Sequence, residues 1–211
     1  MSQHTVIFDI ETSPLPDSYL DLICPEFEAP ANFKDPDKIA ANLAEKKAQW
    51  KSRAALSPLT GKVLCIGVLD IDGTFVVMDG DGDERVVLEQ FRKFADHNKD
   101  SQIVGFNIHS FDIPFLCKRA WKHGIQPCVS PGTRLFSSDR WIDLRNIWQM
   151  GDKTAEGSLD AIAKFFGVGA KSGSGADFAA LWESDKAAAT EYLRNDLNLT
   201  RDIAERMGVL F

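Results

Sequence analysis

The segment HTVIFDIET, residues 4–12, joins a run of β-forming residues to two carboxylates. Its β-branched and aromatic side chains predict a buried strand over residues 4–10, which ends at the turn that Pro14 favours. Asp9 and Glu11 are two residues apart, so both side chains leave the same face of a sheet. Paired carboxylates at a buried strand end need a positive partner, and Mg²⁺ prefers such oxygen ligands. Two acids that face solvent are the alternative, because the Asp-x-Glu spacing alone is not specific.

Strands and helices alternate along the rest of the chain. Hydrophobic periodicity predicts further strands over residues 62–71, 75–78 and 103–106. The Asp72-Gly73 turn makes the first two of these antiparallel neighbours. Helices are predicted over residues 37–53, 83–97, 111–123, 143–150, 158–166, 176–182 and 185–207. The sequence therefore predicts an α/β domain with a mixed sheet near its N-terminus and helices against it.

The length of 211 residues suits one domain with a substantial core. We expect a single domain over residues 1–211, with a helical insertion at about residues 25–60 that begins with Asp37 as a helix N-cap. Residues 34–62 carry seven Lys or Arg and three acids, a local charge of +4. This basic helix and Trp50 are a candidate path for a nucleic-acid strand. A solvated helix with Trp50 in the core is an equal alternative.

Acidic residues outnumber basic ones, 31 against 24, which gives a formal charge of −7 at pH 7. No global basic field attracts nucleic acid or an anionic membrane, so a nucleic-acid partner requires bound cations or a local basic patch. Four scattered cysteines form no CxxC pair, which argues against structural zinc and suits a reducing compartment. Residues 1–4 lack the pattern of a signal segment, and no apolar run approaches the length of a membrane span. We therefore expect a cytoplasmic protein with no membrane partner.

Two loops have only a superficial likeness to ion-binding and phosphate-binding motifs. Residues 79–83, DGDGD, suggest a calcium loop, but Glu84 stands where an EF-hand requires glycine, so a turn and helix cap are expected. Residues 167–175 contain Lys171 and Ser172 but lack the two glycines of a phosphate-binding loop. We expect a flexible loop near a cleft, with Lys171 as a candidate contact for a backbone phosphate.

Three residues later in the chain could join the first acidic pair. Asp112 follows the predicted strand 103–106 and begins a helix, whereas Tyr192 and Asp196 lie four apart on one face of the last helix. Each has an ordinary explanation, as a helix-capping aspartate or an exposed helix pair. Their joint order, Asp-x-Glu, then Asn-x-x-x-Phe-Asp, then Tyr-x-x-x-Asp, is much harder to attribute to coincidence.

This order resembles the DEDDy branch of 3′–5′ exonucleases, and in particular the stand-alone relatives of the proofreading domain of family B DNA polymerases. The three motifs are FDIET at residues 8–12, NIHSFD at 107–112 and YLRND at 192–196. The likeness extends to LSPLTGKV at residues 56–63 and SLDAIA at 158–163, and it covers essentially the whole chain.

The resemblance implies a ribonuclease H-like fold, with a mixed five-stranded sheet flanked by helices. It also implies that two divalent cations, Mg²⁺ or Mn²⁺, are held by Asp9, Glu11, Asp112 and Asp196. Two such ions would offset the negative charge of the chain and turn the carboxylate cluster into a phosphate site.

Tyr192 assigns the branch, because the sister branch has a histidine five residues before the last aspartate, where this chain has Glu191. The resemblance gives Tyr192 the task of positioning the attacking water. A phenol with an ordinary pKa near 10 is a poor base at pH 7, which agrees with an orienting role. The 3′ end of the substrate would be held by Thr12, Asn107 and Phe111.

The expected function is metal-dependent 3′–5′ exonuclease activity on single-stranded ends, DNA in preference to RNA, with release of 5′-mononucleotides. A catalytically silent nucleic-acid-binding module of the same fold is the alternative. A phosphatase of the haloacid dehalogenase type is a further one, but that chemistry requires Asp where this chain has Glu11.

Overall fold

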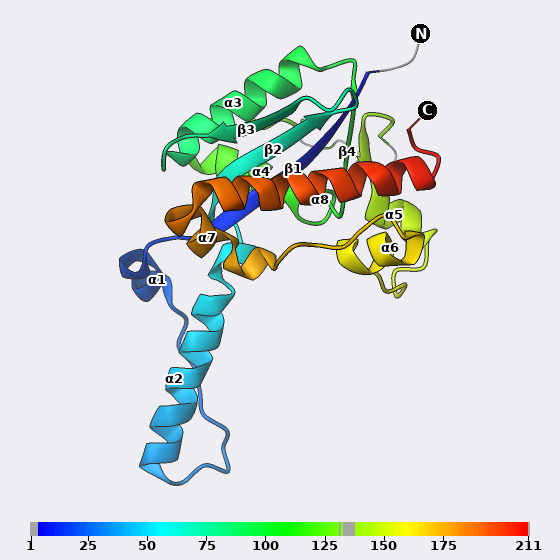
Figure 1. Ribbon diagram of the computed structural model, residues 1–211. Coiled ribbons are helices and arrows are strands. Elements are labelled where there is room, and N and C mark those ends of the chain that lie inside the picture. The colour runs from blue at the N-terminus through cyan, green and yellow to red at the C-terminus, as the bar shows by residue number, and fades with distance from the viewer. Residues whose placement is uncertain (1–3, 131, 133–137, 211) are drawn as a thin grey trace. The chain divides into compact units, whose positions relative to one another are not determined.

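A five-stranded sheet forms the centre of the structure, a computed structural model that describes residues 4–130, 132 and 138–210 (Figure 1). The strand order is β3-β2-β1-β4-β5. The strands are β1 (Thr5–Pro14), β2 (Gly61–Asp70), β3 (Phe75–Asp79), β4 (Gln102–Gly105) and β5 (Trp141–Asp143). β2 and β3 pair antiparallel, whereas β4 lies parallel to both β1 and β5. The expected mixed five-stranded sheet flanked by helices is confirmed.

The β2–β3 hairpin forms as the Asp72-Gly73 turn predicts, with Ile66 opposite Met78. The strand β5 was not predicted from periodicity, because only three residues take part and so short a run carries no pattern. The strand is held in place by its pairing with β4, in which Gly105 at the end of β4 pairs with Asp143 at the end of β5.

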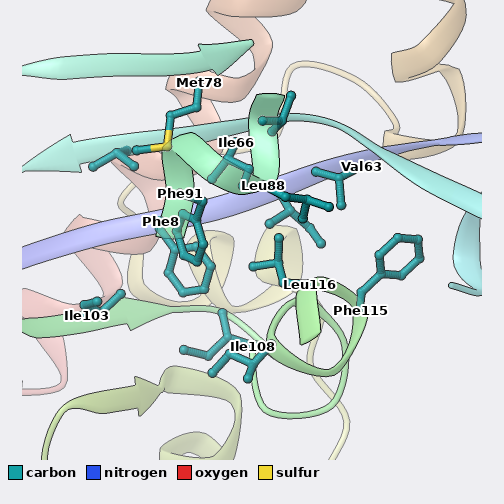
Figure 2. Packing of buried hydrophobic residues seen from close by; sticks show 14 of the residues in the cluster. Phe8, Val63, Ile66, Met78, Leu88, Phe91, Ile103, Ile108, Phe115 and Leu116 are labelled. Atoms are coloured by element: carbon teal, nitrogen blue, oxygen red, sulfur yellow. The ribbon is translucent and has the colours of Figure 1, made fainter. Parts of the chain in front are cut away.

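The two faces of β1 enter two different cores. Val6, Phe8 and Ile10 belong to one hydrophobic cluster, whereas Ile7 belongs to the other, as the period of two along a strand requires. The first cluster contains residues of α3 (Glu84–His97) and α4 (Asp112–Lys122). Figure 2 shows this packing, in which the Phe8 ring stacks on the Phe91 ring of α3 with centroids 5.4 Å apart.

The second core is covered by the C-terminal helices. These are α5 (Leu144–Gln149), α6 (Leu159–Phe166), α7 (Phe178–Ser184) and α8 (Lys186–Arg206). In Figure 1, α8 runs in orange to red across this face of the sheet. Leu193, Leu197 and Ile203 of α8 are fully buried there, which fixes the rotation of the helix about its own axis.

Residues Thr12–Lys62 form a compact unit of their own, apart from the unit made by Met1–Glu11 and Val63–Phe211. It contains α1 (Asp17–Ile23), α2 (Pro36–Ser52) and a short 3₁₀ helix (Ala54–Leu56). The expected single domain with an insertion at about residues 25–60 stays a prediction.

One helix of this unit was not predicted, and one expectation about the unit is wrong. No helix was predicted over residues 17–23, yet α1 forms there with Pro16 at its N-cap position, since proline is tolerated where a helix begins. The N-cap of α2 is Asp35 and not Asp37, because Pro36 takes the first helical position and the Asp35 carboxylate accepts a hydrogen bond from the Asp37 N–H. Hydrophobic periodicity predicts that a helix is present more accurately than it predicts the residues at which the helix begins and ends.

Within the described residues, every helix is too short or too polar to cross a lipid bilayer. Residues 1–3, which contributed to the expectation that no signal segment is present, lie outside the described part of the chain.

Gly67 of β2 allows α8 to pack directly on the sheet. A Cβ atom at this position would lie 2.8 Å from both Leu193 Cγ and Leu197 Cδ1. We expect Gly67→Ala to lower the free energy of unfolding by about 1–3 kcal/mol, because the added methyl group overpacks a filled core. Urea unfolding of both proteins measures this difference.

Gly175→Ala is the matched control, because its added Cβ would meet only the Tyr192 hydroxyl oxygen at an ordinary 3.9 Å. Equal stability of Gly67→Ala and the wild-type protein would show that the contact between α8 and β2 is looser than described.

Candidate active site

Three carboxylates from β1 and α8 meet at one point. Asp9, Glu11 and Asp196 each place an oxygen atom so that all three atoms lie within 4.8 Å of one another. Asp9 and Glu11 share the β1 face of Ile7, which is the face that α8 covers. Asp196 is 2% exposed and Glu11 8% exposed, whereas Asp9 is partly buried, so most of the cluster is shielded from water.

Tyr192 lies one helical turn before Asp196 on α8, so both side chains project from the same face. The Tyr192 ring packs against Phe178 with centroids 5.7 Å apart, and the side chain is 5% exposed. Among the residues that the structure describes, neither the buried Tyr192 hydroxyl nor the buried Asp196 Oδ1 has a hydrogen-bond partner. Buried polar atoms normally have partners, so these two are suited to a ligand that the protein itself does not provide.

Asp112 connects the start of α4 to β1. It is the first residue of the helix, 2% exposed, and its Oδ1 accepts a hydrogen bond of 3.1 Å from the Ile10 N–H. This places its carboxyl group next to Asp9, and the Asp9 charge contributes to a raised pKa of Asp112. The sequence predicted an aspartate in the first turn of a helix, and the structure adds that this aspartate faces the acidic pair.

Asp143 holds the loop between β4 and α4. Its Oδ1 accepts from the Asn107 N–H at 2.8 Å, and its Oδ2 accepts from the His109 N–H at 2.9 Å. Asn107 has a φ of 64°, a left-handed conformation that asparagine tolerates better than most residues. Asp143 is also the N-cap of α5. The sequence indicates only this capping role, so Asp143 was not predicted as a site residue.

A cavity of about 490 Å³ opens onto these residues. Its lining includes seven of the residues predicted from the sequence, Asp9, Glu11, Asn107, Phe111, Asp112, Tyr192 and Asp196. It also includes Lys171, which was expected to contact a backbone phosphate, and Arg145, which was not predicted. Thr12 belongs to the second compact unit, where its hydroxyl donates a hydrogen bond of 2.8 Å to the Ala55 carbonyl, and its substrate contact stays a prediction.

Burial and mutual repulsion favour protons on the carboxylates. Burial and the charge of Asp196 raise the pKa of Asp9 to about 7. Burial and the charge of Asp9 hold the pKa of Glu11 well above its ordinary value. Carboxylic acids with such raised pKa values bind a cation with release of protons.

Lys171 brings one positive charge into the cluster. Its Nζ lies 2.5 Å from Asp196 Oδ2, and the contact raises the pKa of Lys171 although burial opposes its charge. The segment that carries it is a loop beside the cavity, as expected, and it is held by hydrogen bonds from the Lys171 N–H to Asp160 Oδ1 and from Asn195 to the Ala170 carbonyl. These partners are distant in sequence, so no local pattern could have indicated them.

Two lysines of the basic helix α2 form ion pairs with acidic residues of the same unit. Lys47 and Lys51 both contact Asp21 Oδ1 at 2.9 Å, and Lys51 also contacts Asp17 at 3.0 Å. Across Thr12–Lys62, seven basic residues face seven acidic ones, so the local excess disappears once the whole unit is counted. Trp50 lines a separate cavity of about 600 Å³ in this unit.

Comparison with known proteins places the chain in a family. A family model described as the RNase_H superfamily matches residues 54–205, which is more than two thirds of the sequence. The chain belongs to the RNase_H superfamily. This membership supports nuclease-type chemistry.

A solved structure similar to this RNase_H-superfamily chain is the family B DNA polymerase from the hyperthermophilic archaeon Pyrobaculum calidifontis. The TM-score is 0.65 and the sequence identity 22%, and the match covers 98% of this chain and 25% of the polymerase chain. The likeness shows a shared fold, and this chain spans a quarter of that protein. A comparison with curated protein sequences gave no match.

The carboxylate cluster of this RNase_H-superfamily chain fits a hard divalent cation. All three ligand groups offer carboxylate oxygen, which suits Mg²⁺ and Mn²⁺. Asp196 Oδ1 is a buried acceptor without a partner, and a bound cation would satisfy it. The same charge would remove the repulsion that now favours protonated side chains.

We expect cation binding to release protons and to tighten as the pH rises. Asp9 with a pKa of about 7 is largely protonated at pH 6, and an ion binds its ionised form. The affinity for Mn²⁺ should therefore increase between pH 6 and 7.5, by up to about tenfold per pH unit for each proton released. Calorimetric titrations in buffers of different ionisation enthalpy count the protons.

Without a cation, the raised pKa of Asp9 makes the folded protein less stable as the pH rises, whereas the affinity for Mn²⁺ increases. Between about pH 4 and 7 the folded protein holds a proton on Asp9 that the unfolded chain has lost, so this group contributes less stability as the pH rises. An Mn²⁺ affinity that stays constant between pH 6 and 7.5 would contradict the description of a protonated carboxylate cluster.

Proposed function

We propose that this protein is a metal-dependent 3′–5′ exonuclease that removes 5′-mononucleotides from single-stranded ends, of DNA in preference to RNA. The observation that carries the proposal is the convergence of Asp9, Glu11 and Asp196 within 4.8 Å, with Asp112 next to Asp9. RNase_H-superfamily membership supports nuclease chemistry, and the likeness to a DNA polymerase favours DNA.

In this proposal, two divalent ions, Mg²⁺ or Mn²⁺, are held by Asp9, Glu11, Asp112 and Asp196. Such ions supply Lewis-acid stabilisation of the phosphoryl oxygens and a water that ionises near neutral pH. The protein contributes the negative charge and the burial that concentrate cations at this point. A chain with a formal charge of −7 gains in this way a local attraction for phosphate.

Tyr192 would orient the attacking water. Burial raises the pKa of Tyr192 to about 12, so its hydroxyl remains protonated at neutral pH and cannot serve as a general base. The hydroxyl is buried without a partner and lines the same cavity as the carboxylates.

Asn107 and Phe111 would hold the terminal nucleotide. Both line the cavity, and the Asn107 backbone is fixed by Asp143. Phe111 is only partly buried, which leaves ring surface on which a base can stack. Thr12 would add a contact from the residue after Glu11. A cavity of about 490 Å³ suits one nucleotide, which favours action at an end.

The first test is degradation of a 5′-labelled single-stranded DNA oligonucleotide and of the RNA oligonucleotide of the same sequence, with Mg²⁺, Mn²⁺ or EDTA. We expect a ladder that shortens from the 3′ end, faster for DNA, and no degradation with EDTA. Shortening from the 5′ end would overturn the proposed polarity. Binding of both strands without degradation would favour a silent nucleic-acid-binding module.

Asp112→Asn should abolish this activity while the fold persists, because the amide oxygen can still accept from the Ile10 N–H but a carboxylate charge is lost. We expect a loss of at least about 100-fold in turnover. Asp96→Asn is the matched control, since Asp96 is exposed on α3 and pairs with Arg92 at 2.8 Å. Full activity of Asp112→Asn would remove this residue from the proposed site.

Tyr192→Phe should lower turnover more than substrate binding, by about 10–100-fold, because the water loses its orienting hydroxyl while the ring packing on Phe178 remains. Single-turnover rates and oligonucleotide dissociation constants, measured for both proteins, separate the two effects. An unchanged rate would exclude the orienting role.

A further inference from the structure

Lys171 occupies the acidic cluster in a way that the exonuclease proposal does not use. Its ammonium group lies 2.5 Å from Asp196 Oδ2 and 5.2 Å from the centre of the Tyr192 ring. The Asp196 side chain is 3% exposed and the Lys171 side chain 25%, so the pair is shielded from water on one side and open on the other. In this partly buried setting, water screens the attraction between the two charges less than it screens a surface ion pair.

The backbone around Lys171 is built to place it there. The Lys171 N–H donates a hydrogen bond of 3.0 Å to Asp160 Oδ1 on α6, and Asn195 on α8 donates one of 3.2 Å to the Ala170 carbonyl. A Cβ atom at Gly169 would lie 2.8 Å from Leu199, so this segment approaches α8 more closely than a larger residue permits. The lysine is therefore positioned from both helices.

The location of Lys171 coincides with a place that a metal ion needs. Asp196 belongs to the three carboxylates whose oxygens lie within 4.8 Å of one another, and its Oδ2 is already in contact with an ammonium group. An ion that took Asp196 Oδ2 as a ligand would displace the ammonium group, and an ion on the unpartnered Oδ1 would still share this carboxylate with the lysine and be repelled by it. Within the described part of the chain, neither Asp9 nor Glu11 forms such a contact with a lysine.

We propose that Lys171 is a resident cation of this site, which holds the position at Asp196 until a divalent ion displaces it. The inference rests on the proposed metal site and adds an order to its filling. The position at Asp9 and Glu11 fills first, and the position at Asp196 fills at higher ion concentration because the lysine contact must break. The long side chain of Lys171, already partly exposed, has solvent to move into.

The test measures Mn²⁺ binding in the absence of nucleic acid, by calorimetry and by loss of the free-ion electron paramagnetic resonance signal. We expect the wild-type protein to bind two ions in separate steps. In Lys171→Met the second step should tighten by at least about tenfold, the equivalent of ~1.4 kcal/mol. Lys171→Gln, which is also neutral, should show the same tightening of the second step. It serves as the test variant if Lys171→Met does not fold.

Lys93→Met is the matched control, because it removes the same charge from an exposed position on α3. Its two binding steps should equal those of the wild-type protein. If the affinities of Lys171→Met and Lys171→Gln also equal those of the wild type, Lys171 does not compete for Asp196 and the inference is overturned. If no protein binds Mn²⁺ at all, the proposed metal site itself fails, which is a separate result.

Thermal unfolding adds an independent readout. In EDTA, Lys171→Met should unfold at a lower temperature than the wild type, because Asp196 loses its only counter-charge within the described residues. Saturating Mn²⁺ should raise the unfolding temperature of Lys171→Met by more than that of the wild type or Lys93→Met. Equal shifts in all three proteins would contradict the exchange of a lysine for an ion.

Discussion

The packing of α8 on the sheet is the contact on which the site depends. Gly67 lets the helix approach β2 closely, and Leu193 and Leu197 fill the space that remains. Tyr192 and Asp196 lie on the same helix as these core residues, so the rotation that buries the leucines also fixes the direction of the site residues. The geometry of the acidic cluster is in this sense a result of core packing.

The electrostatic cost of this arrangement is concentrated in a small volume. Asp9, Glu11, Asp112 and Asp196 are drawn from three elements and withdrawn from water, which raises the pKa of each. A fold that had only its own stability to maintain would not gather such groups, because their mutual repulsion opposes folding. Lys171 offsets part of this repulsion, and a cation would offset more.

The sequence predicted the fold because strand periodicity and the hairpin turn are local signals. The face shared by Asp9 and Glu11 followed from their spacing of two, and the position of Asp112 from the strand before it. The strand β5 and the helix α1 were not predicted, β5 because it is three residues long and α1 because it is seven residues long and directly follows Pro16. Asp143 was not placed in the site, and Lys171 was expected there only as a phosphate contact and not as a partner of Asp196, since these contacts join segments distant in sequence.

The helix α8 both packs on the sheet and carries site residues, and this combination restricts how the length of the chain can vary. An inserted or deleted residue within the helix before Tyr192 would rotate every later residue by about 100°, so the leucines would leave the core as the tyrosine and aspartate left the cavity. Substitutions on the solvent side of the helix carry no such penalty. Changes in length are tolerated far better in surface segments, where loop closure costs little. Differences in size among proteins of this fold are therefore expected in the loops and in units such as Thr12–Lys62, while the last helix keeps its register.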